Sequence, residues 1–222
     1  MAKQLALDLG TPVAPPATVV SRSNEDAYRL LSEWPRWPHP IMLVTGPAGA
    51  GKSHLAARFG EAVGSPVHAG SRLSADGVLD LVAAPMVVDD ADAADDRVLF
   101  HLINAVRNAG TTLLLTATSR RVGGLADLDS RLRAVPEVAM DPPDDALLRQ
   151  VIIEGFQARQ LPAEPAVVNF LMSRIERTLH DAVHWVNMLD KEGLAQKRGP
   201  TRPLASRLLK AEGGSPFDDS VP

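Results

Sequence analysis

The stretch IMLVTGPAGAGKSHLAARFGEAV, residues 41–63, decides the fold of this chain. It opens with an apolar run at 41–45, which predicts a buried strand, and closes with apolar residues at helical spacing over 52–63. Between them, residues 46–53 read GPAGAGKS and match the phosphate-binding P-loop pattern GxxxxGK[ST]. A strand, a glycine-rich loop and a helix in this order form the context in which that pattern binds a nucleotide.

Each residue type in this loop has a chemical reason. Glycines let successive backbone N–H groups turn toward phosphate oxygens without a Cβ in the way, and the following helix presents its positive end to the same anion. We expect Lys52 to neutralise the β and γ phosphates and the Ser53 hydroxyl to ligate Mg²⁺. The predicted nucleotide-binding residues of this segment are Gly46, Pro47, Ala48, Gly49, Ala50, Gly51, Lys52, Ser53 and His54.

A second motif, MVVDD at residues 86–90, is an apolar strand that ends in two carboxylates. Asp89 is placed to hold Mg²⁺ opposite Ser53, directly or through water, and Asp90 to orient or deprotonate an attacking water. The alternative is a strand that simply ends in a solvated acidic loop, because further aspartates follow it. The P-loop in the same chain favours the site, more strongly for Asp89 than for Asp90.

The remaining apolar patterns predict an α/β fold followed by an all-helical region. Runs at 111–118 and 137–140 predict strands, and 95–110 predicts a helix. Strands that alternate with helices indicate a parallel sheet covered on both faces. Beyond two prolines at 142–143 the spacing is helical throughout, over 144–160, 164–175, 178–190 and 203–211. The expected organisation is a leader and flexible linker at 1–18, a nucleotide-binding core at 19–140, a helical domain at 141–211 and a disordered tail at 212–222.

Composition excludes several classes of protein. The 222 residues contain no cysteine, which removes thiol catalysis, zinc fingers and Fe–S clusters. The formal net charge of −4 argues against a dedicated nucleic-acid binder. No apolar run reaches the roughly 18 residues that a membrane span needs, and the first residues do not make a secretory signal. We therefore expect a cytoplasmic protein with no membrane partner.

The two motifs, the strand at 111–118 and the helical region resemble the AAA+ ATPases, and among them the DnaA replication initiators. The resemblance implies an AAA+ core with a small helical lid, and it places Asn24 in the segment around the adenine. Residues 116–118 occupy the sensor-one position, although the family often has Asp where Thr118 stands. Arg177 matches the sensor-two arginine of the lid.

The same resemblance assigns a role to Arg131. The sequence DSRL at 129–132 matches the box that carries the arginine finger, a cation that stabilises charge on a neighbour's nucleotide. Without this frame, Arg131 and Arg177 are ordinary surface charges, which are common and contribute little to stability.

The N-terminal segment QLALDLG resembles the short peptide by which bacterial proteins bind the DNA polymerase sliding clamp. In an extended strand its leucines lie on one side and can enter an apolar groove, while the glutamine amide satisfies buried polar groups. The alternative is a strand that docks on the protein's own sheet, but the proline-rich linker that follows favours binding to a partner. The predicted clamp-binding residues are Gln4, Leu5, Leu7 and Leu9.

Together these features resemble the Hda-type regulatory inactivators of DnaA. The resemblance implies a protein that holds ADP (or ATP) with Mg²⁺, binds the sliding clamp, and stimulates ATP hydrolysis by DnaA through Arg131, so that replication initiation is shut off. Its own ATPase activity is expected to be weak or absent. No DNA-reading domain is recognised, so no direct sequence-specific DNA binding is expected, and a homo-oligomer stays open. The alternative is a self-hydrolysing AAA+ ATPase that loads or remodels a replication partner and depends on Lys52 and Asp90.

Overall fold

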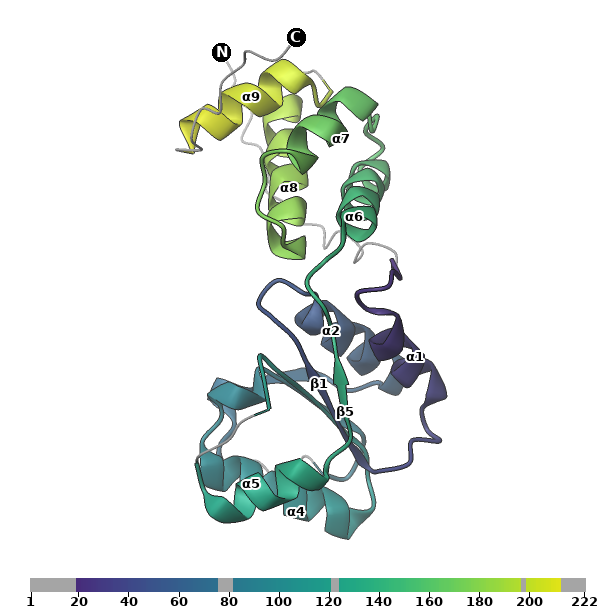
Figure 1. Ribbon diagram of the computed structural model, residues 1–222, viewed down its shortest axis with the longest axis vertical. Helices are drawn as coiled ribbons and strands as arrows, with labels where there is room; N and C mark the ends of the chain where they lie inside the picture. Colours follow the sequence, from purple (N-terminus) through teal and green to yellow (C-terminus); the bar gives the residue numbers. More distant parts are fainter. Residues whose placement is uncertain (1–18, 76–81, 121–123, 197–198, 213–222) are drawn as a thin grey trace, which may run out of the picture. The chain divides into compact units, whose positions relative to one another are not determined.

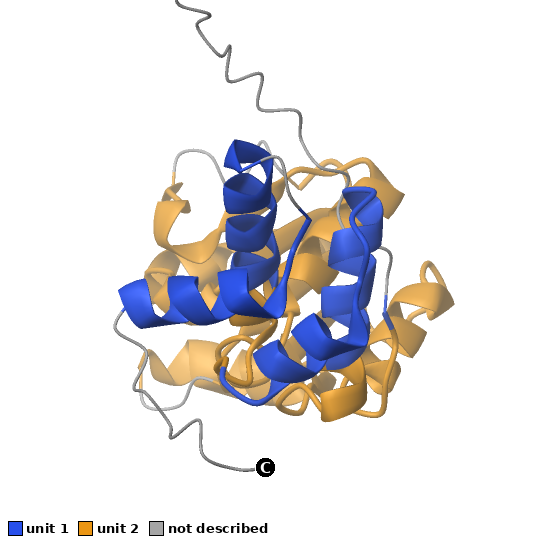
Figure 2. Ribbon diagram, turned by 90° about the horizontal axis from the view of Figure 1, so that it is seen from above, with its two compact units in different colours: residues 1–19, 149–174, 183–222 blue, residues 20–148, 175–182 orange. Residues whose placement is uncertain are grey.

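The computed structural model (Figure 1) describes residues 19–75, 82–120, 124–196 and 199–212. The predicted clamp-binding leader and nearly all of the predicted tail lie outside the described residues. The chain divides into two compact units, coloured separately in Figure 2. We call residues 20–148 and 175–182 the sheet unit, and the described parts of 149–174 and 183–212 the helical unit.

The sheet unit is built on five parallel strands, which confirms the predicted α/β class. Their order is β2-β3-β4-β1-β5. The strand that leads into the P-loop, β1, pairs on one side with β4 and on the other with β5, so it is anchored by backbone hydrogen bonds on both edges. The strands are β1 (Ile41–Thr45), β2 (Val67–Ala69), β3 (Met86–Asp89), β4 (Leu113–Ala117) and β5 (Glu137–Ala139).

Helices cover both faces of this sheet, as predicted. Figure 1 shows α1 and α2 on one face and α4 and α5 on the other. Successive side chains of β1 point to opposite faces: Ile41 and Leu43 join the core on the α4 side, and Met42 and Val44 join the core on the α2 side. The helices are α1 (Glu25–Glu33), α2 (Lys52–Val63), α4 (Asp96–Ala109) and α5 (Ala126–Ala134).

Each end of α4 is closed by a capping residue. The Asp95 carboxylate accepts hydrogen bonds from the backbone N–H groups of Arg97 and Val98, which the first turn of a helix leaves without helical partners. At the other end Gly110 adopts the left-handed conformation, with φ of 66°, in which a helix commonly stops. Asp95 therefore caps the start of α4, and Gly110 ends it.

The apolar patterns did not predict β2, α1 or α5. The edge strand β2 has three residues and exposed ends, so it contributes no apolar run. The helix α5 buries only Leu128 and Leu132, too few to produce a visible helical stripe. The positions of β2 and α5 are therefore set by what these elements pack against rather than by an apolar pattern of their own.

Two tryptophans pack beside α2 in the sheet unit. The Trp37 ring stacks on Phe59, with 5.0 Å between ring centroids, and Trp34 meets the same ring edge-on at 6.0 Å. The indole N–H of Trp37 donates to the Leu30 carbonyl at 2.6 Å. These tryptophans therefore report on the packing of the sheet unit, whereas Trp185 is buried in the helical unit.

The helical unit contains no strand among its described residues. Its helices are α6 (Asp145–Ala158), α7 (Pro165–Met172), α8 (Leu179–Ala195) and α9 (Arg202–Ala211), although the first turns of α6 and α8 belong to the sheet unit. The guanidinium of Arg159 joins the end of α6 to α8, through Asp190 at 3.4 Å. No helix in the described part of the chain combines the length and the apolar composition that crossing a bilayer requires.

Candidate nucleotide site

The P-loop joins the end of β1 to the start of α2. Lys52 is the first residue of α2, and its side chain folds back so that Nζ donates to the carbonyls of Gly46, at 2.8 Å, and Pro47, at 3.0 Å. Only 7% of the residue is exposed. The loop is therefore curled around a nearly buried cation, the arrangement that a phosphate site requires.

Two glycines of the loop are required by both conformation and space. Gly49 and Gly51 have φ of 76° and 100°, where a side chain is strained. A Cβ on Gly49 would also lie 2.4 Å from the Cβ of Thr178, and the Gly49 carbonyl accepts a hydrogen bond from the backbone N–H of Leu179 at 3.0 Å. The start of α8 thus packs directly on the phosphate-binding loop.

A cavity of about 510 Å³ opens beside this loop, a volume typical of small-molecule sites. The P-loop and the start of α2 form one wall, and the ends of β3 and β4 form the other. Its lining residues are Ala48, Gly49, Lys52, Ser53, Asp90, Asp92, Ala93 and Thr118.

The two carboxylates that end β3 face different environments. The hydroxyl of Thr116, on β4, donates to Asp89 and accepts from the backbone N–H of Asp90 at 3.1 Å. Asp90 adopts a left-handed conformation with φ of 52°, and its side chain lines the cavity. Asp89 is therefore occupied by a strand-to-strand contact, while Asp90 faces the space in which a nucleotide would lie.

The environment of Asp90 shifts its protonation. Desolvation raises the pKa of Asp90 above its ordinary value, the charges of Asp89 and Asp92 raise it further, and Lys52 partly opposes them. A carboxylate with a raised pKa in a cavity holds a proton more strongly, which suits a group that orients or deprotonates water.

Asp92 is a lining residue that the sequence did not single out as part of the site. It sits in a short 3-10 turn, Ala91–Ala93, and its carboxylate accepts from the backbone N–H of Thr118 at 3.0 Å. This contact joins the loop after β3 to the end of β4. No pattern in the sequence distinguishes Asp92 from the neighbouring aspartates, because its partner lies 26 residues away.

The cavity lining contains only part of the predicted site. The predicted nucleotide-binding and Mg²⁺-binding residues that are not among the lining residues are Gly46, Pro47, Ala50, Gly51, His54, Asn24, Arg177 and Asp89. Asn24 is buried and its side chain accepts from the backbone N–H of Ser21 at 2.8 Å, so it organises the chain before α1. Arg177 forms an ion pair with Asp145. His54, the third residue of α2, is half-buried, and burial lowers its pKa, with Arg58 adding to the effect and Glu61 opposing it.

Arg131 also lies outside this lining. Its guanidinium is 5.1 Å from the centroid of the Phe100 ring on α4, a cation–π contact, and the residue is partly exposed. Within the described residues Arg131 has no ion-pair partner. The group predicted to serve a neighbour's nucleotide is thus held by an aromatic face rather than by a carboxylate.

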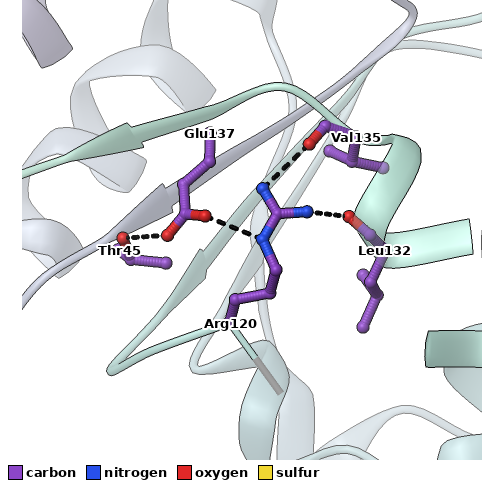
Figure 3. A network of polar contacts seen from close by, with 5 residues as sticks. All are labelled: Thr45, Arg120, Leu132, Val135 and Glu137. Carbon is purple, nitrogen blue, oxygen red and sulfur yellow. Dashed lines mark hydrogen bonds and ion pairs between the residues drawn. The ribbon is translucent and has the colours of Figure 1, made fainter. Parts of the chain in front are cut away.

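A polar network lies on β1 and β5 next to the P-loop (Figure 3). Glu137 on β5 accepts from the hydroxyl of Thr45 at 2.6 Å and from the Nε of Arg120 at 2.7 Å. Arg120 also donates to the carbonyls of Leu132 and Val135, at the C-terminal end of α5. Partial burial by itself would raise the pKa of Glu137, but the hydrogen bonds from Thr45 and Arg120, with the Arg120 charge, hold it below its ordinary value.

This network gives the sheet unit an acid-sensitive contribution to stability. The folded-state pKa of Glu137 lies below its value in the unfolded chain, so the contribution is complete above the ordinary value of 4.5 and is lost as pH falls through the lower folded value. We expect Glu137→Gln to reduce the free energy of unfolding at pH 7 by about 1 kcal/mol and to flatten its decline between pH 5 and 3, about the range over which such a carboxylate titrates. Urea unfolding followed by fluorescence in a Trp185→Phe background reports the sheet unit alone.

Glu33→Gln is the matched control. It removes the same charge, but from an exposed residue at the end of α1. If the difference in unfolding free energy between the parent and Glu137→Gln stays constant from pH 7 to pH 3, the network does not act through the Glu137 carboxylate.

The lining fits a nucleotide with Mg²⁺. The Lys52 ammonium and the N-terminal end of α2 supply positive charge for phosphates, and the exposed Ser53 hydroxyl lies in the lining as a hard oxygen ligand. The described residues contain no cluster of three or more His, Asp or Glu side chains that could hold a metal ion alone. Mg²⁺ is usually held by one or two protein oxygens together with water and substrate phosphates, and the Ser53 hydroxyl can supply one of them.

Comparison with known proteins identifies the fold. No family model matches the sequence. An uncharacterized protein of Haemophilus influenzae is 24% identical over 188 residues, 77% of this chain and 81% of that protein. Domain III of the replication initiation protein DnaA from Thermotoga maritima has a TM-score of 0.73, with 17% identity over 90% of this chain and 95% of that domain. The chain has the AAA+ P-loop ATPase fold.

Two further structures support the same fold. AMPPCP-bound DnaA from Aquifex aeolicus gives a TM-score of 0.70 at 14% identity, and covers 88% of this chain and 68% of its own. The RuvB Holliday junction branch migration motor of Thermotoga maritima gives 0.66 at 16% identity, with 84% and 68% covered. Within the AAA+ fold, the chain is therefore structurally similar to DnaA. Sequence identities this low show a shared fold and nothing more.

Proposed function

We propose that this chain is an AAA+ regulator that holds ADP and activates ATP hydrolysis by a DnaA-type initiator, as the Hda-type inactivators do. The observation that carries the proposal is the place of Arg131. It lies on α5, outside the cavity of its own P-loop, with a partly exposed guanidinium that contacts Phe100. An arginine that serves the same chain's nucleotide would line that chain's cavity, so Arg131 is better placed to act on a neighbour.

In this proposal Arg131 enters the nucleotide site of ATP-bound DnaA. Water attacks the γ-phosphorus, the bond from that phosphorus to the β–γ bridging oxygen breaks, and the products are ADP and phosphate. The guanidinium stabilises the negative charge that develops on the transferred group and the leaving oxygen. Initiation would then stop because the initiator is converted to its ADP form.

The N-terminal leader would bring this activity to the replicating DNA. Its alternating leucines suit an apolar groove on the sliding clamp, and a weak peptide contact on a tether raises the local concentration of the activator. A clamp held on DNA therefore selects where and when DnaA is inactivated.

A second candidate function is supported by Asp90. Its carboxylate lines the chain's own cavity and has a raised pKa, as a group that activates water would. That arrangement favours a self-hydrolysing AAA+ ATPase that loads or remodels a replication partner.

One reconstitution separates the two functions. DnaA is loaded with radiolabelled ATP and freed of excess nucleotide, this chain is loaded with unlabelled ADP, and both are mixed with or without sliding clamp on DNA. The proposal expects label to become ADP only when this chain and the DNA-loaded clamp are both present. Steady hydrolysis of ATP by this chain alone, abolished by Asp90→Asn, with no conversion of DnaA-bound label, would support the second candidate instead.

Loss of the leader should abolish this dependence on the clamp. We expect Gln4→Ala combined with Leu5→Ala to weaken clamp binding by more than about tenfold, because a buried leucine and a satisfied amide are both lost. Binding is measured by surface plasmon resonance on immobilised clamp. Leu194→Ala is the control, since Leu194 is an apolar side chain on α8 that is 70% exposed and lies outside the leader. Equal affinities of the parent and the double variant would contradict clamp binding through the leader.

A further inference from the structure

The helix that carries Arg131 is held at both ends by side chains from elsewhere in the sheet unit. Before its first residue, the backbone N–H of Leu125 donates to the Asp96 carboxylate at 3.0 Å. At its end, the carbonyls of Leu132 and Val135 accept from the guanidinium of Arg120. Between these ends α5 buries only Leu128 and Leu132, so side-chain packing alone does little to fix its orientation.

The C-terminal end of α5 is a place where a cation is favourable. The last carbonyls of a helix have no helical partners and carry partial negative charge. Here the N–H of Val135, the residue after α5, donates to the Leu132 carbonyl at 3.2 Å, and Pro136 after it has no N–H to offer a further carbonyl. Arg120 supplies that function with two nitrogens of its fork, one on each carbonyl, while its Nε remains on Glu137 at 2.7 Å (Figure 3).

The other end of this network is fixed to the sheet. Glu137 lies on β5 and is held by the hydroxyl of Thr45, at 2.6 Å, the last residue of β1 and the one that precedes the P-loop. Thr45 is 5% exposed, and its carbonyl accepts from the backbone N–H of Met140 at 2.7 Å. The guanidinium of Arg120 is therefore held rigidly from the sheet side and transmits that rigidity to the carbonyl of Leu132, the residue next to Arg131.

We infer that Arg120 is a positioning residue for the arginine finger. It fixes the last turn of α5, and through that turn it sets the direction in which Arg131 projects. The inference rests on the proposed function for the role of Arg131, but the effect of Arg120 on α5 belongs to this chain alone. Catalytic groups displaced by about 1 Å lose on the order of 100-fold in rate. Loss of the Arg120 contacts should therefore lower the rate contribution of Arg131 rather than weaken binding.

The test uses the full-length chain with three substitutions. Arg120→Ala removes the contacts to Glu137 and to the two carbonyls. Arg120→Lys keeps the charge but has a single nitrogen, which cannot reach Glu137 and both carbonyls. Arg133→Ala is the control, because Arg133 is an exposed arginine on the same helix outside the network. Each is made in the parent and in an Arg131→Ala background.

Two readouts are expected to change together. Hydrogen exchange of the amides at 131–135 should accelerate by about tenfold or more in Arg120→Ala, while β1 and the P-loop keep their protection. The maximal rate of DnaA-bound ATP hydrolysis should fall by about tenfold or more, with unchanged ADP affinity and little change in the concentration for half-maximal effect. Arg120→Lys should be intermediate and Arg133→Ala like the parent. In the Arg131→Ala background, Arg120→Ala should add nothing, because its effect passes through the finger.

The outcomes separate the two claims. Unchanged exchange at 131–135 in Arg120→Ala overturns the inference whatever happens to DnaA, as does parental activation by that variant. A loss of ADP affinity as large as the loss of activation rate also overturns it, because Arg120 would then stabilise the whole site. So does a further fall in the activation rate when Arg120→Ala is added to Arg131→Ala. If the parent chain itself fails to activate DnaA, the proposed function fails. Accelerated exchange confined to 131–135 would still show that Arg120 holds the end of α5.

Discussion

Replacing Arg131 with alanine is expected to lower the stimulated rate of ATP hydrolysis by DnaA by about 10³-fold or more, the effect that a finger supplied in trans has on phosphoryl transfer. The charge that develops in the transition state would lose its compensating cation. Neither neighbouring arginine is placed to replace it, because Arg133, on the same helix, faces solvent, and Arg120, which precedes α5, is held by Glu137 and the helix carbonyls. Single-turnover conversion of DnaA-bound ATP, with clamp on DNA, measures the effect.

The same substitution should leave the chain's own ligands in place. Arg131 does not line the P-loop cavity, so ADP affinity should remain parental, and clamp binding should be unaffected. Arg131→Lys keeps a positive charge without the planar fork and should retain only a small part of the activity. An Arg131→Ala protein that activates DnaA as the parent does would remove the basis of the proposed function.

Lys52→Ala should have the largest effect on nucleotide binding by this chain, at least about 100-fold in Kd. The ammonium is nearly buried in the loop, and a contact between it and phosphate is worth about 1.5–3 kcal/mol for each hydrogen bond. The substitution also removes the hydrogen bonds from Nζ to the carbonyls of Gly46 and Pro47, so the loop loses part of its curvature. Titration with a fluorescent ADP analogue measures the change.

Lys191→Ala is the matched control, because it removes an exposed lysine that belongs to the helical unit and is not among the residues that line the cavity. Comparable ADP affinities of Lys52→Ala and the control would mean that the cavity beside the P-loop is not where this chain binds its nucleotide.

Much of the sheet unit could be predicted from local patterns. The strand β1 and the helix α2 occupy the predicted ranges, 41–45 and 52–63, because a buried strand and an amphipathic helix each leave a periodic apolar signature. The edge strand β2 and the helix α5 could not be predicted in this way, since their side chains are mostly exposed.

The residues of the candidate site likewise divide into those that a local motif predicts and those that depend on strand pairing. Ser53 and Lys52 were predicted because phosphate is bound by consecutive residues of one loop, so the motif contains the geometry. Asp92 was missed, and Asp89 lies on Thr116 rather than in the cavity lining, because both positions depend on how β3 and β4 pair.

A local motif was enough to establish that this chain carries a P-loop with its strand and helix, since the chemistry of phosphate binding is contained in eight consecutive residues. The direction of Arg131 and the contacts that Arg120 makes depended on the folded sheet. Glu137 meets Thr45 across 92 residues, and Arg120 meets Val135 across 15. Contacts between residues so far apart are set by strand order and register, which a linear pattern does not encode.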